Sequence, residues 1–105
     1  MKFITVEELK EKLEKENTVH LFDVREEIEH EDYNIGGINY PISKIKKMDI
    51  DPIAHLKNEE VICYCRNGQK TSNDACLMLE YMGFTNVVLV GGGVRAWEDK
   101  FEERL

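Results

Sequence analysis

Three short runs of apolar residues constrain the fold of this chain most. They are residues 19–22, 61–64 and 87–90. Each run is too short for a stable helix and is bounded by polar or turn-forming residues, so each predicts a buried strand. Residues 38–40, just before Pro41, predict a further brief strand. Strands that read as continuous apolar runs are typical of a parallel sheet that is covered on both faces.

Helical patterns separate these runs. Thr5 and Glu8 fit a capping box at the start of the first helix. Asp51 can cap a short helix that has Pro52 at its first position, and Gly83 ends the clearest helix. The predicted helices cover residues 6–15, 42–47, 52–56, 71–82 and 94–101, and a solvated helical turn covers residues 25–32. The alternation predicts an α/β fold, with helices on both faces of a central, mostly parallel sheet of about five strands.

Length and composition narrow the class of protein. The chain has 105 residues, which fits one domain over residues 1–105 with a core that needs no disulfide or metal. A net charge of -7 argues against nucleic-acid binding. No apolar run approaches the ~20 residues of a membrane span, and the start turns acidic too soon for a signal peptide. We therefore expect a cytoplasmic protein with no nucleic-acid or membrane partner.

The cysteines indicate neither disulfides nor a metal. Cys63, Cys65 and Cys76 are an odd number in a compartment that is expected to be reducing. Their spacing differs from that of zinc motifs, and no histidine lies near them in the sequence. Cys63 and Cys76 are expected to be buried structural residues, and a Cys63–Cys65 redox pair is an alternative.

The loop after the central apolar run is the candidate active site. It reads Cys65-Arg66-Asn67-Gly68-Gln69-Lys70-Thr71. Free cysteines are largely protonated at neutral pH, but three local features favour a thiolate at Cys65. A helix starts directly after the loop, Gly68 permits a turn whose backbone amides point inward, and Arg66 and Lys70 add positive charge.

Two other segments should lie near this loop. Asp23 and Arg25 follow one predicted strand, and Gly91-Gly92-Gly93 follows another. The carboxyl ends of parallel strands share one edge of a sheet, so these segments and Cys65 should converge. Asp23 and Arg25 are supporting residues under two interpretations. Either Asp23 pairs with a loop cation while Arg25 anchors the neighbouring turn, or the two form a structural ion pair.

The chain resembles the single-domain rhodaneses, sulfurtransferases of the thiosulfate type. The loop matches the family pattern Cys-Arg-x-Gly-x-(Arg or Lys)-(Ser or Thr). Residues 21–26 with 35–41 resemble the first family motif, and residues 90–97 resemble the closing one, so the resemblance covers essentially the whole chain. The chain departs from the pattern at Asn34, where histidine is frequent, and at Gly37, where alanine is usual. Lys70 stands where arginine is common. It keeps the positive charge but lacks the planar guanidinium group that can bind an oxyanion at two points.

This resemblance implies a rhodanese-like three-layer sandwich and a ping-pong sulfur transfer. Cys65 would attack the outer sulfur of a donor such as thiosulfate, hold it as a persulfide, and pass it to cyanide or a thiol. Residues 66–71 would bind the donor, with Arg66 and Lys70 steadying its oxyanion. No cofactor is implied. The partners would be a small anionic sulfur donor and a thiol or cyanide acceptor, with a sulfur-relay protein as a further candidate partner.

Other functions remain open or are disfavoured. A persulfide carrier that acts with a partner protein needs the same cysteine, and a non-catalytic regulatory module would not need it. Phosphatases and arsenate reductases with a related fold use a Cys-x5-Arg loop, but position 71 is threonine here. Trp97 is expected in the core, and Arg95 is not assigned to the site. Residues 26–32 form either a solvated acidic face or a docking surface for a basic partner.

Overall fold

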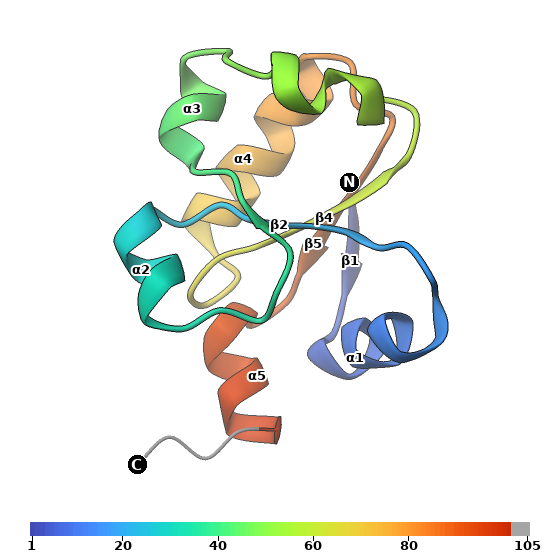
Figure 1. Cartoon of the computed structure of the whole chain (residues 1–105), viewed down its shortest axis with the longest axis vertical. Helices are drawn as coiled ribbons and strands as arrows, with labels where there is room; N and C mark the ends of the chain where they lie inside the picture. Colours follow the sequence, from blue (N-terminus) through green and yellow to red (C-terminus); the bar gives the residue numbers. More distant parts are fainter. Residues whose placement is uncertain (102–105) are drawn as a thin grey trace.

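Five parallel strands form the central sheet of the computed structural model, which describes residues 1–101 (Figure 1). They lie in the order β1-β5-β4-β2-β3. The strands are β1 (Lys2–Ile4), β2 (His20–Asp23), β3 (Ile38–Asn39), β4 (Glu60–Tyr64) and β5 (Asn86–Val90). The four predicted strands are confirmed, and the pairings of the described strands are all parallel, in agreement with the mostly parallel sheet that the sequence predicts.

The sequence pattern missed strand β1. Its three residues are short for a strand signal, and Phe3 is 67% exposed because β1 lies at the edge of the sheet. The strand exists through its pairing with β5, in which Lys2 lies opposite Val88 and Ile4 opposite Val90. That pairing joins segments near opposite ends of the chain, so no local sequence pattern predicts it.

Helices cover both faces of the sheet, as predicted (Figure 1). They are α1 (Val6–Lys15), α2 (Glu27–Asp32), α3 (Ile42–Lys46), the 3-10 helix η1 (Asp51–Leu56), α4 (Lys70–Tyr81) and α5 (Gly93–Phe101). Helices α1 and α5 pack on one face, and α3, η1 and α4 pack on the other. Within β4, Ile62 faces the first layer and Val61 the second, which explains why the strand is apolar at every position.

The ends of the helices mostly follow the sequence signals. Glu8 donates its backbone N–H to Thr5 Oγ1 at 3.1 Å, and Thr5 donates its own to Glu8 Oε1 at 3.0 Å, which confirms the capping box. The assignment of Asp51 as a helix cap is wrong. Buried Ile50 occupies the cap position, so Asp51 becomes the first helical residue, where its charge favours the positive end of the helix.

Helix α2 lies at the surface of the molecule. Helix α2 buries none of its residues, which confirms the prediction of a solvated helical turn in this segment. No helix within residues 1–101 combines the length and the apolar character that a membrane crossing requires.

Candidate active site

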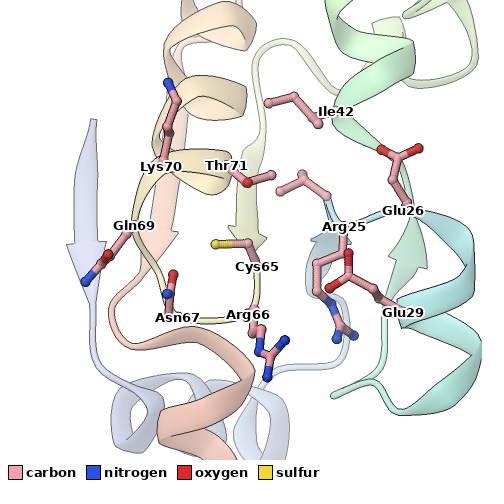
Figure 2. A pocket seen from close by; sticks show the side chains of 11 residues that line it. Arg25, Glu26, Glu29, Ile42, Cys65, Arg66, Asn67, Gln69, Lys70 and Thr71 are labelled. Atoms are coloured by element: carbon pink, nitrogen blue, oxygen red, sulfur yellow. The ribbon is translucent and has the colours of Figure 1, made fainter.

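A pocket of about 410 Å³ lies beyond the carboxyl ends of β2 and β4 (Figure 2). Its lining includes most of the predicted site. The lining residues are Val24, Arg25, Glu26, Glu29, Ile42, Cys65, Arg66, Asn67, Gln69, Lys70 and Thr71. Gly68 and Asp23, which also belong to the predicted site, do not line the pocket. The expected convergence at this edge of the sheet is confirmed for the segments after β2 and β4.

Cys65 lies directly after β4, and its side chain is 3% exposed. Figure 2 shows the sulfur pointing into the space that the following loop encloses. The sulfur lies 3.0 Å from the Oγ atom of Ser72, which is fully buried in the first turn of α4. The thiol donates to the hydroxyl in this arrangement. The N-terminus of α4 therefore approaches the sulfur both through its dipole and through a side chain.

Sequence reasoning missed Ser72. Side chains in an α-helix tilt toward the N-terminus, so a hydroxyl in the first turn can reach back to the loop before the helix. Ser72 has this position because Gln69 is the N-cap of α4. The sequence could have identified Ser72 from its place three residues after the N-cap. That inference requires the first residue of α4 to be predicted to within one position.

The segment that follows β5 packs against the backbone of the Cys65 loop. Val94 donates its backbone N–H to the Cys65 carbonyl at 2.9 Å, and Arg95 donates to the Arg66 carbonyl at 2.8 Å. Gly93 has φ +56°, and a Cβ there would overlap the carbonyl oxygen of Cys65. Gly68, at φ +69°, approaches the Val90–Gly92 backbone equally closely. The Gly91-Gly92-Gly93 segment therefore fixes the loop and does not line the pocket.

Asp23 and Arg25 form a buried ion pair below the pocket. Arg25 donates from Nη2 to Asp23 Oδ2 at 2.8 Å and from Nε to Asp23 Oδ1 at 3.0 Å. Arg25 Nη2 also donates to the Tyr33 carbonyl at 2.5 Å, and His30 Nδ1 lies 2.9 Å from Asp23 Oδ2. The structural ion pair is therefore confirmed, with Arg25 anchoring the neighbouring turn. The alternative pairing of Asp23 with a loop cation is wrong.

The pKa of Asp23 reflects this pairing. Burial opposes its ionisation, but the hydrogen bonds from Arg25 and His30 outweigh burial and hold the pKa below its ordinary value. Burial likewise opposes the charge on Arg25, and Asp23 outweighs it, so the pKa of Arg25 is raised. Both side chains are charged at neutral pH.

The loop cations do not face the sulfur. The Lys70 ammonium lies 3.0 Å from Asp74 Oδ2, and its side chain is 88% exposed. Figure 2 shows the ends of Lys70 and Arg66 pointing away from the Cys65 sulfur. On the opposite side of the pocket, Glu26 and Glu29 line the wall. These two acidic residues were assigned to a solvated or docking face, so the prediction missed that they reach the site.

The two other cysteines are structural in this fold. Cys63 and Cys76 are both fully buried. A hydrogen bond with Cys76, together with burial, raises the pKa of Cys63 well above its ordinary value, which keeps the thiol neutral. Among residues 1–101, no group of histidine, cysteine and acidic side chains is arranged to hold a metal ion. Trp97 is 8% exposed and packs edge-on against Phe101, which confirms its place in the core.

The family comparison agrees with this architecture. The model of the Rhodanese family, described as a rhodanese-like domain, matches residues 5–100. The chain belongs to the rhodanese-like domain family. The rhodanese-like domain protein of Staphylococcus aureus superposes with a TM-score of 0.81 at 32% identity, covering 100% of this chain and 99% of that one. The human single-domain sulfurtransferase TSTD1 has a TM-score of 0.81 over 95% of this chain and 97% of that chain; its 24% identity shows the shared fold alone.

The chain is also similar to curated proteins of different names and lengths. The candidate sulfurtransferase YtwF of Bacillus subtilis is 35% identical over 100 residues, which cover 93% of this chain and 91% of the relative. The tRNA uridine(34) hydroxylase of Buchnera aphidicola is 30% identical over 88% of this chain, and the candidate sulfur carrier protein YrkF of B. subtilis is 29% identical over 94%. The matched region spans 30% and 52% of the length of these last two proteins.

Proposed function

We propose that this chain is a sulfurtransferase that carries a sulfane sulfur as a persulfide on Cys65. The observation that carries the proposal is the Cys65 sulfur itself, which faces a pocket at the N-terminus of α4 and contacts the Ser72 hydroxyl. The N-terminal end of a helix dipole attracts negative charge, so an anionic donor or persulfide is accommodated beside it. The names of two relatives, a candidate sulfurtransferase and a candidate sulfur carrier, support sulfur transfer in general.

In the first half-reaction the Cys65 thiolate attacks the outer sulfur of a donor such as thiosulfate. A bond forms between Sγ and that sulfur, the sulfur–sulfur bond of the donor breaks, and sulfite leaves with the electron pair. The Ser72 hydroxyl, which contacts Sγ, can donate to the thiolate before it attacks, and the outer sulfur of the persulfide carries the negative charge afterwards. Residues 66–71 would bind the donor through their backbone amides and polar side chains, and Arg66 and Lys70 would contribute positive charge.

In the second half-reaction a nucleophilic acceptor attacks the outer sulfur of the persulfide. Cyanide would leave as thiocyanate, and a thiolate would leave as a new persulfide. The bond between Sγ and the outer sulfur breaks, and Sγ takes the electron pair, so the Cys65 thiolate is regenerated. Sulfur moves between nucleophiles without an external oxidant or reductant, and the chemistry needs no metal or organic cofactor.

A persulfide carrier is the second candidate, favoured by the similarity to the candidate sulfur carrier YrkF. Steady formation of thiocyanate from thiosulfate and cyanide by the isolated chain would support the enzyme. Persulfide on Cys65 that forms only from a partner's persulfide would support the carrier. Turnover that persists in Cys65→Ser would contradict both.

A further inference from the structure

One wall of the Cys65 pocket carries the carboxylates of Glu26 and Glu29, and this arrangement has a consequence for the acceptor. Resting on the sulfurtransferase function above, we propose that the acceptor is a small aminothiol, a molecule with an ammonium group close to its thiol. The carboxylates of Glu26 and Glu29 would receive the ammonium group while the thiol sulfur reaches the persulfide on Cys65.

The carboxylates lie on one face of the chain segment that enters α2. Glu26 is the N-cap residue of α2, and Glu29 follows three residues later, which places both on the same side. Ser43, in α3, donates from Oγ to Glu26 Oε1 at 3.0 Å, so a hydrogen bond to α3 holds the Glu26 side chain. Both residues line the pocket together with Cys65 (Figure 2). An ammonium group in the pocket would therefore meet two carboxylates, of which Glu26 is held by Ser43.

The nearby cations are engaged elsewhere. Arg25 uses its guanidinium on Asp23 and on the Tyr33 carbonyl, although Glu29 adds to its electrostatic environment. The Lys70 ammonium contacts Asp74 outside the pocket. Arg66 and Glu29 both line a second hollow, of about 270 Å³, and the Arg66 guanidinium points away from the sulfur in Figure 2. The wall formed by Glu26 and Glu29 therefore presents two carboxylates to the pocket.

Such a wall discriminates between acceptors of different charge. An exposed carboxylate a few ångströms from an ammonium group changes a rate constant by about two- to fivefold, so two carboxylates give about tenfold. An acceptor with a carboxylate in place of the ammonium group is repelled by the same wall. A volume of about 410 Å³ accommodates a molecule of the size of cysteine or cysteamine.

Transfer of the outer sulfur to an aminothiol balances in atoms and electrons, as transfer to any other thiol does. The thiol loses its proton to solvent, and the thiolate attacks the outer sulfur of the Cys65 persulfide. The bond between that sulfur and Sγ breaks, Sγ leaves as the thiolate, and the aminothiol departs as a persulfide. One negative sulfur attacks and one is released, so no further reactant enters.

The test begins with protein that is loaded on Cys65. The chain is incubated with thiosulfate or inorganic polysulfide, excess donor is removed, and the gain of one sulfur is verified by intact mass. Loss of that sulfur is then timed with cysteamine, 2-mercaptoethanol and 3-mercaptopropionate, each rate divided by its thiolate concentration. We expect cysteamine to react about tenfold faster than 3-mercaptopropionate, with the difference falling as salt is added.

Matched variants distinguish the effect of the pocket carboxylates from the effect of the protein's overall charge. In the double variant Glu26→Gln and Glu29→Gln, the preference should fall to about twofold or less, because the wall loses its charge. The double variant Glu27→Gln and Glu31→Gln removes the same charge from exposed positions on α2 outside the pocket and should keep the preference. Cysteine serves as a further arm, and a rate near that of cysteamine assigns recognition to the amine.

Two outcomes would overturn the inference while leaving the proposed function intact. One is a loaded protein that reacts equally with the three thiols or prefers 3-mercaptopropionate. The other is a preference for cysteamine that survives in the Glu26→Gln and Glu29→Gln variant. Failure of Cys65 to gain sulfur from either donor would instead reject the sulfurtransferase function, and with it this inference.

Discussion

The Ser72 hydroxyl lies 3.0 Å from the Cys65 sulfur, and both side chains are buried. A thiol can donate to this hydroxyl, and the hydroxyl can turn and donate to a thiolate or persulfide. The contact therefore satisfies the sulfur in each form that a sulfur-transfer cycle requires. Under the proposed function, Ser72 would be a positioning residue, because it would act through Cys65.

Replacing this hydroxyl should reduce the reactivity of Cys65. In Ser72→Ala the thiolate loses a hydrogen bond worth about 1 kcal/mol, which corresponds to about a fivefold slower alkylation by iodoacetamide at neutral pH. An unchanged alkylation rate in Ser72→Ala would contradict a role for this hydroxyl at the sulfur.

Thr71→Val is the matched control for Ser72→Ala. It removes the hydroxyl of the adjacent residue, whereas the hydroxyl that contacts the sulfur belongs to Ser72. We expect this variant to alkylate at close to the natural rate. Equal losses of rate in the two variants would contradict a specific role for Ser72.

The Asp23–Arg25 pair predicts a defined dependence of stability on pH. Asp23→Asn leaves Arg25 buried without its charge partner and should lower the free energy of unfolding by about 3 kcal/mol at pH 7. Because the pKa of Asp23 is lower in the folded than in the unfolded state, its stabilisation is complete above the unfolded value of about 4. The stabilisation is lost as the pH falls through the lower, folded-state value.

Urea unfolding of both proteins at pH 7 and at pH 3 measures this effect. The difference between the natural protein and Asp23→Asn should shrink at the lower pH. Glu31→Gln, at an exposed position on α2, should change stability little at either pH. A difference between the natural protein and Asp23→Asn that does not vary with pH would show that the charge of Asp23 is not what stabilises the fold.

Gly93 should tolerate no side chain. Gly93→Ala combines a left-handed backbone, which costs about 1–2 kcal/mol, with an overlap on the Cys65 carbonyl that displaces the Cys65 loop. Gly36→Ala has the first cost without the second, because a Cβ at Gly36 meets nothing within 4 Å. We expect thermal unfolding to show the larger loss for Gly93→Ala, and sulfur loading to fall in that variant alone. Equal behaviour of the two variants would refute the support role of Gly93.

The layers of the fold were predictable because the central strands are buried on both sides. Every residue of β4 from Val61 to Tyr64 is buried, so its apolar run is uninterrupted and easy to recognise. Strand β1 was not predictable, because its partner β5 lies at the far end of the chain. Within the site, Cys65 was marked by local chemistry. The positions of Glu26 and Glu29 depend on how α2 packs beside the loop, which only the tertiary structure determines.

The direction of Lys70 was predictable in part. Asp74 stands four residues after Lys70 on α4, a spacing that favours an ion pair on the helix surface. Because the ammonium group is exposed and paired, Lys70→Ala should slow persulfide formation from thiosulfate by no more than about threefold. Arg66→Ala serves as the comparison, and its loss should be larger because Arg66 borders both hollows at the site. A larger loss in Lys70→Ala would assign the donor oxyanion to Lys70.

Intact mass after incubation with thiosulfate tests the persulfide on Cys65 most directly. The natural protein should gain one sulfur atom, and cyanide should remove it. Cys65→Ser should gain none, whereas Cys63→Ser should still gain one, because Cys63 is fully buried and held neutral. A Cys65→Ser protein that still gains a sulfur removable by cyanide would contradict the assignment of Cys65 as the sulfur carrier.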